Sequence, residues 1–165
     1  MIITIIYIII SFLLDGLVSN LIPFNLIEPS YFKTIYSIIA LVIIYNYFDN
    51  KSKYITILII LGIFFDIVYT NTFILNIVVF LTIYLILSIV DYIIPTNIIT
   101  INIKSIFCIF LYHLLTYIIL LLANYNNYSI KLLGLILLRS IIMTIIYTTI
   151  SYLIMNKIYD NKRIK

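Results

Sequence analysis

Residues 54–90 are the most informative stretch of this chain, and they read YITILIILGIFFDIVYTNTFILNIVVFLTIYLILSIV. Two apolar runs, 54–69 and 73–90, flank the short segment Thr70–Thr72. Each run approaches the roughly 18–20 residues that cross a bilayer as a helix. Three residues are too few to cross back over anything, so the two runs must be neighbours in an antiparallel hairpin. The stretch therefore predicts two adjacent transmembrane helices.

The rest of the chain repeats this pattern. Of its 165 residues, 65% are hydrophobic and only 10% are charged, which is too little polar surface to cover a water-exposed globule. The N-terminus has no basic region or small-residue cleavage site, so we expect a retained first helix. We predict an all-α polytopic membrane protein, a single domain over residues 1–165 with about six transmembrane helices. The predicted segments are 2–22, 31–48, 54–69, 73–90, 105–123 and 132–154.

The basic residues set the expected orientation, because cytoplasmic loops of membrane proteins are enriched in Lys and Arg. With the N-terminus inside, two basic residues, Lys33 and Lys131, lie outside, and Arg139 lies within the last segment. Both chain ends are therefore expected in the cytoplasm. No clustered basic stripe indicates a nucleic-acid partner. The cytoplasmic basic residues would be Lys51, Lys53, Lys104, Lys157, Lys162, Arg163 and Lys165.

Three ionisable residues fall inside the predicted spans: Asp15, Asp66 and Arg139. A charge at the bilayer centre costs about 2.5–3.5 kcal/mol on insertion scales, so each is a candidate functional residue. Arg139 is the cation among them, and a carboxylate is its natural bidentate partner. We expect Arg139 to pair with Asp66 or with Asp15. The alternative is that each side chain reaches separately toward the outer headgroups.

Small polar residues recur every four positions in two of the segments, which places them on one helix face. Such rows are more typical of helix–helix hydrogen bonding than of a transport path. Gly62 lies one turn before Asp66, where it would let a neighbouring helix approach the carboxylate. His113, in the fifth segment, is interpreted as a core residue rather than a proton relay. The rows are Ser11, Asp15 and Ser19, and Ser140, Thr144 and Thr148.

One short pattern occurs twice. Residues 15–20 (DGLVSN) and 66–71 (DIVYTN) both fit D-x-[LV]-x-[ST]-N, and both close a predicted helix that runs outward. A parallel repeat of two helices would explain this echo, since such repeats occur in membrane folds. The composition is strongly biased toward Ile, Tyr, Asn and Lys, so chance similarity explains it equally well.

The motifs of intramembrane and soluble enzymes are missing. The chain has one His, no G-x-S-x-G and no H-E-x-x-H sequence, and its spaced aspartates do not match a metal-dependent headgroup transferase. Cys108 is the single cysteine, which excludes an intrachain disulfide or a cysteine metal cluster. We expect no catalytic residue, no cofactor and no metal site.

Residues 61–76, LGIFFDIVYTNTFILN, resemble the central signature of the MreD family of rod shape-determining membrane proteins. That signature has a Gly, a hydrophobic triplet, an Asp, an aliphatic pair and a Tyr-Thr turn, which correspond here to Gly62, Asp66, Tyr69 and Thr70. Arg139 resembles the Arg that opens the last helix in many members. One departure concerns residues 74–76, where the family often has a Gly and this chain has Ile-Leu-Asn. It would affect how closely the two hairpin helices can approach.

The resemblance implies a non-enzymatic scaffold of the cell-elongation complex in the bacterial plasma membrane. Its implied protein partners are an MreC-like bitopic membrane protein, RodA, a class B penicillin-binding protein and the MreB cytoskeleton. The lipid bilayer surrounds the chain itself. The family's six-helix fold is similar to the substrate-binding subunits of energy-coupling-factor vitamin transporters, which supplies an alternative function. A transporter subunit should contain a cavity open to the outside and lined by polar and aromatic residues.

Overall fold

The computed structural model describes residues 2–21, 34–48, 50–123 and 130–163, and over these residues the chain is helical without strands. Five helical stretches are long and apolar enough to cross a membrane, which makes this an all-α, multi-pass membrane protein. The elements are α1 (Ile2–Leu21), α2 (Tyr36–Tyr45), α3 (Lys51–Phe65), the π-helical turn η1 (Asp66–Thr70), α4 (Leu75–Ile93), α5 (Ile98–Leu122) and α6 (Ile130–Arg163).

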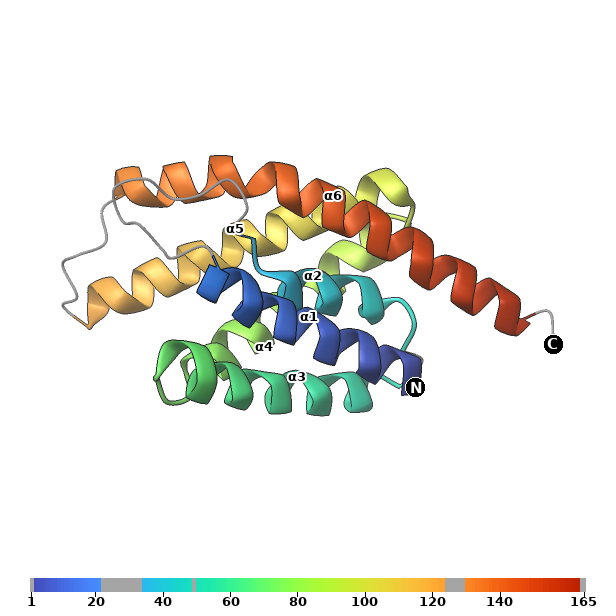
Figure 1. Cartoon of the computed structure of the whole chain (residues 1–165), viewed down its shortest axis with the longest axis horizontal. Helices are drawn as coiled ribbons and strands as arrows, with labels where there is room; N and C mark the ends of the chain where they lie inside the picture. Colours follow the sequence, from blue (N-terminus) through green and yellow to red (C-terminus); the bar gives the residue numbers. More distant parts are fainter. Residues whose placement is uncertain (1, 22–33, 49, 124–129, 164–165) are drawn as a thin grey trace.

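The helices run side by side along the long axis of the molecule (Figure 1). Both chain ends lie at the same end of the bundle, together with the α2–α3 and α4–α5 connections. The α3–α4 turn lies at the opposite end. This arrangement agrees with the predicted topology, in which both termini lie on one side of the membrane. The helices α3 and α4 form the expected antiparallel hairpin.

The prediction of a full span over residues 31–48 is wrong for the described part, residues 34–48, whereas residues 31–33 lie outside the described residues. Helix α2 has 10 residues and is about 15 Å long, whereas the hydrocarbon core is about 30 Å thick. All of its residues are buried, and it contacts α1, α5 and α6 at the centre of the bundle. A helix that is apolar on all sides is stable where other elements surround it. Composition could not separate this burial in protein from burial in lipid.

The start of the fifth helix also differs from the prediction. The segment was expected from residue 105, but α5 begins at Ile98, where the Asn97 side chain accepts hydrogen bonds from two first-turn N–H groups. This capping box begins the helix before the predicted segment, so that residues 98–104 are helical as well. Lys104 therefore lies inside α5 and is only 2% exposed. Its Nζ donates to Asp91 Oδ1 at 2.6 Å and to the Ile94 carbonyl at 3.1 Å, so it is not one of the exposed cytoplasmic charges.

Hydroxyl groups join the first and last helices. Ser11 Oγ lies 2.8 Å from the Tyr147 hydroxyl, and Thr4 Oγ1 lies 2.6 Å from the Tyr159 hydroxyl. A third hydrogen bond, 2.8 Å long, joins Thr34 just before α2 to Thr144 on α6. Within the predicted polar rows, Ser11 and Thr144 thus form hydrogen bonds to other elements, whereas Ser19 is exposed and Ser140 donates within its own helix.

Candidate functional site

The α3–α4 hairpin is organised around Asp66. Helix α3 continues into the π-helical turn η1, and α4 begins a few residues later. Asp66 Oδ1 accepts hydrogen bonds from the Thr72 hydroxyl at 2.5 Å, from the Asn76 backbone N–H at 3.0 Å and from the Asn76 side-chain amide at 2.9 Å. Thr70 Oγ1 lies 2.6 Å from the Thr72 hydroxyl. The carboxylate therefore binds both the turn and the first turn of α4.

Asn76 extends this network to a third helix. Its side chain is fully buried, and its Oδ1 accepts a hydrogen bond from the Tyr112 hydroxyl of α5 at 2.9 Å. Sequence reasoning named neither Asn76 nor Tyr112 as a site residue. An Asn among the apolar residues that begin the second hairpin helix was the available signal, since a buried amide needs hydrogen-bond partners.

Gly62 lies at a close approach between α3 and α4. A Cβ atom at this position would lie 2.9 Å from Ile77 Cα, a backbone atom that a rotamer change cannot move. The neighbouring helix does approach here, as expected from the sequence. The absence of Gly from residues 74–76 has a different consequence: Ile74 adopts φ 71° and ψ −10°. A β-branched residue in this left-handed region is strained.

Tyr69 connects the hairpin to α1. Its hydroxyl donates to the Phe12 carbonyl at 2.5 Å, and its ring packs against Phe12 and Phe65. A Cβ atom on Gly16 would lie 2.7 Å from the Tyr69 hydroxyl oxygen, so this glycine makes room for the tyrosine. The four residues of the hairpin signature thus make contacts within the hairpin or with its neighbour α1.

Asp15 has a comparable role for α2. Its Oδ1 accepts a hydrogen bond from the Tyr36 N–H at 2.7 Å, and its Oδ2 accepts one from the Ser37 N–H at 2.9 Å. These are the first two residues of α2. The N-terminal N–H groups of a helix lack partners in their own helix, and a carboxylate also complements the positive end of the helix dipole. Asp15, on the neighbouring helix α1, supplies both the hydrogen-bond acceptors and the negative charge.

The expected pairing of Arg139 with Asp15 or Asp66 is not among the ion pairs of the described residues, where Lys104 pairs with Asp91. The two aspartates bind the first turns of α2 and α4. Arg139 lies half-buried on α6.

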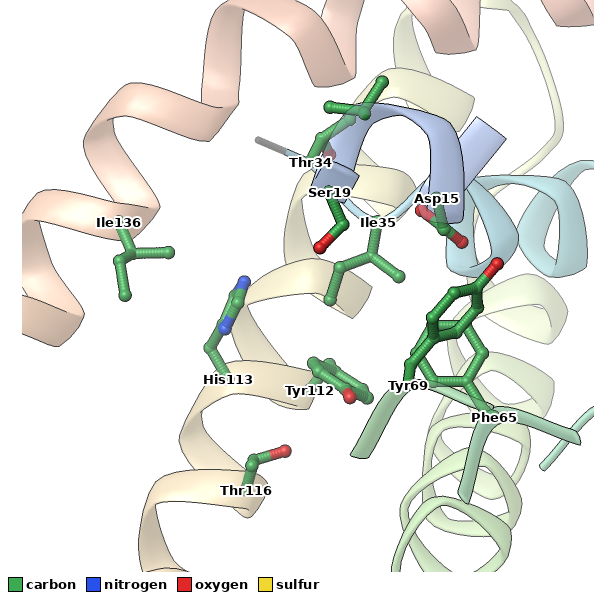
Figure 2. A pocket seen from close by; sticks show the side chains of 11 residues that line it. Asp15, Ser19, Thr34, Ile35, Phe65, Tyr69, Tyr112, His113, Thr116 and Ile136 are labelled. Atoms are coloured by element: carbon green, nitrogen blue, oxygen red, sulfur yellow. The ribbon is translucent and has the colours of Figure 1, made fainter. Parts of the chain in front are cut away.

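A cavity of about 380 Å³ lies beside Asp15, between α1, η1, α5 and α6. Figure 2 shows the Ser19 hydroxyl and the His113 ring directed into the same space, with Asp15 and Tyr69 across from them. Three aromatic rings, several hydroxyl groups and one carboxylate thus face one space. The described lining residues are Asp15, Val18, Ser19, Thr34, Ile35, Phe65, Tyr69, Tyr112, His113, Thr116 and Ile136.

A second hollow of about 400 Å³ lies between α1 and α3 and is apolar throughout. Its described walls are bulky branched and aromatic side chains. The described lining residues are Ile5, Ile8, Ile9, Phe12, Ile57, Ile60, Leu61 and Phe64.

Comparisons with protein-family models, with curated proteins and with solved structures find no match to this chain. The all-α fold class and the multi-pass membrane character therefore rest on the structure itself. Within the described residues, no group of three or more His, Cys, Asp or Glu side chains could hold a metal ion.

Proposed function

We propose that this chain is a non-enzymatic membrane scaffold of the MreD type, part of a cell-elongation complex. The observation that supports this proposal is the use made of Asp66. In the described residues its hydrogen bonds go to its own turn and to the start of α4, together with Thr70 and Asn76. A carboxylate oxygen used in this way stabilises the shape of a hairpin.

The lipid-facing surface suits a docking function. Large apolar side chains are exposed along both α1 and α3, including Leu13 (55%), Ile60 (49%) and Phe64 (53%). A compact bundle with such faces can bind other membrane subunits by packing within the bilayer. The proposed partners are an MreC-like bitopic protein, RodA, a class B penicillin-binding protein and, at the cytoplasmic side, MreB. The proposed location is the bacterial plasma membrane.

Co-purification and depletion test this proposal. The tagged full chain, extracted in a mild detergent, should recover an MreC-like bitopic protein, and depletion of the chain should convert rod-shaped cells into round ones. Retention of rod shape after depletion, together with the absence of such a partner from the extract, would contradict the scaffold function.

A second candidate function is supported by the cavity beside Asp15. A space of about 380 Å³ with hydroxyl, imidazole and aromatic groups has the size and lining of a small-molecule site. This favours the substrate-binding subunit of an energy-coupling-factor type vitamin transporter. Rescue of depleted cells by an externally supplied vitamin would favour this function, whereas rescue by rod-complex partners would favour the scaffold.

A further inference from the structure

The cavity beside Asp15 has an uneven balance of charge. Among its described lining residues, Asp15 is the single acidic group, and none is Lys or Arg. The N-terminus of α2, which would otherwise attract an anion, is already occupied by the Asp15 carboxylate. A phosphate or carboxylate ligand would therefore meet the negative charge of Asp15, with no Lys or Arg among the described lining residues to offset it. The described lining favours a cation over an anion.

The balance of hydrogen-bond donors and acceptors is also uneven. The Tyr69 and Tyr112 hydroxyls donate their protons to the Phe12 carbonyl and to Asn76 Oδ1, so their oxygens have only lone pairs to offer. Each Asp15 oxygen accepts one backbone N–H and retains a second acceptor position. A ligand that satisfies these atoms must bring several N–H donors of its own.

Two further features suit a cation. The rings of Phe65 and Tyr69, whose centroids are 4.9 Å apart, form one wall of the cavity beside the carboxylate. Aromatic faces attract ammonium groups, and more strongly where water is excluded. The Thr116 hydroxyl is a buried oxygen for which the described part of the chain offers no hydrogen-bond partner. It is available to a ligand.

We infer that this cavity binds a small organic ammonium group, held by Asp15 and the Phe65–Tyr69 wall. An ammonium in contact with Asp15 favours the ionised carboxylate and supplies donors for the Asp15 and tyrosine oxygens. Such a group can come from a free amine or from the ethanolamine headgroup of a membrane lipid. The inference shares with the second candidate function the premise that the cavity holds a ligand, and it does not depend on transport.

Binding to the purified full chain in phosphatidylcholine nanodiscs tests the inference. The probes are 2-phenylethylamine and 2-phenylethanol, which have the same body and differ in the ammonium group. Calorimetry should give saturable binding of the amine, tighter than the alcohol by about tenfold or more, because a hydrogen bond to a charged group is stronger than a neutral one. A lipid arm compares native mass spectra of the chain in nanodiscs with and without phosphatidylethanolamine.

The variant Asp15→Asn removes the charge and keeps one of the two acceptor oxygens at the start of α2. One backbone N–H of α2 therefore loses its acceptor, so the unfolding temperature is measured beside binding, and we expect it to fall by only a few degrees. Amine or ethanolamine-lipid binding should fall by about tenfold or more. Thr82→Val is the matched control, because Thr82 lies on α4, outside the cavity, and donates to the Val78 carbonyl of its own helix.

Each outcome has a distinct meaning. Amine binding in phosphatidylcholine alone supports a soluble ligand, and retention of phosphatidylethanolamine without amine binding supports a lipid ligand. Equal binding of amine and alcohol overturns the ammonium inference but leaves a solute-binding function standing. Absence of both amine binding and lipid retention overturns the inference, as does full binding by Asp15→Asn. None of these results bears on the scaffold function, which the depletion experiment tests.

Discussion

The helix pairs α1–α2 and α3–α4 use the same arrangement with different results. In each, an Asp near the end of the first helix accepts N–H hydrogen bonds from the first turn of the second: Asp15 from Tyr36 and Ser37, and Asp66 from Asn76. The two aspartates open the repeated D-x-[LV]-x-[ST]-N pattern. The shared geometry supports the interpretation of a two-helix repeat over chance similarity.

The two pairs differ in what surrounds the carboxylate. Around Asp66 the turn is short, Thr70 and Thr72 bond to it, and Gly62 lets α4 pack closely. Around Asp15 the following polar residue, Ser19, lines a cavity instead. The comparison teaches that one capping arrangement can either close a hairpin or leave space for a ligand, depending on the residues that follow it.

The largest expected effect is that of Asp66→Ala. The change leaves the N–H and side-chain amide of Asn76 without their acceptor inside the bundle, and we expect a loss of about 3 kcal/mol or more. Thermal unfolding in detergent, followed by circular dichroism, measures it. Asp15→Ala should cost less, because it leaves only two backbone N–H groups without that partner. A greater loss for Asp15→Ala would refute the proposed ranking of the two sites.

Gly62→Ala should have the next largest effect, about 1–3 kcal/mol, because the added methyl group meets the backbone of α4. The same unfolding measurement applies. Gly134→Ala on α6 is the matched control, since a Cβ there has nothing within 4 Å. Equal stability of the two variants would show that α3 and α4 do not need this close approach.

Asp15→Ala should cost about 1–2 kcal/mol, the typical value of a helix N-cap. Asp15→Asn should cost less, because it keeps one of the two acceptor oxygens. Hydrogen exchange should rise at both Tyr36 and Ser37 in the Ala variant, and at only one of them in the Asn variant. Equally fast exchange at both positions in both variants would mean that the charge, not the hydrogen bonding, holds the start of α2.

The smallest effect has the opposite sign. Ile74→Gly should stabilise the protein by up to about 1 kcal/mol, because Gly adopts a positive φ without steric cost. The gain is reduced by the greater freedom of Gly in the unfolded chain. A fall in unfolding temperature would show that the Ile74 side chain contributes more through packing than its backbone loses through strain.

The sequence predicted the spanning helices well because length and apolar composition are direct requirements of a bilayer. It failed at α2, whose apolar residues are buried by other helices and not by lipid, and at the start of α5, where the Asn97 capping box was overlooked. Asp15 and Asp66 were recognisable as charges in apolar runs. Their hydrogen-bond partners could not be predicted, because a backbone N–H many residues away is not identified by the pattern of side chains.

The central position of α2 has a consequence for how the protein is made. This helix is too short to stay in the membrane as a span of its own, and the surfaces that cover it belong partly to α5 and α6. Those helices follow α2 along the chain, separated from it by α3 and α4. The interior of the bundle is therefore completed only after α6 has been made, and chains truncated before α6 should be substrates for membrane proteases.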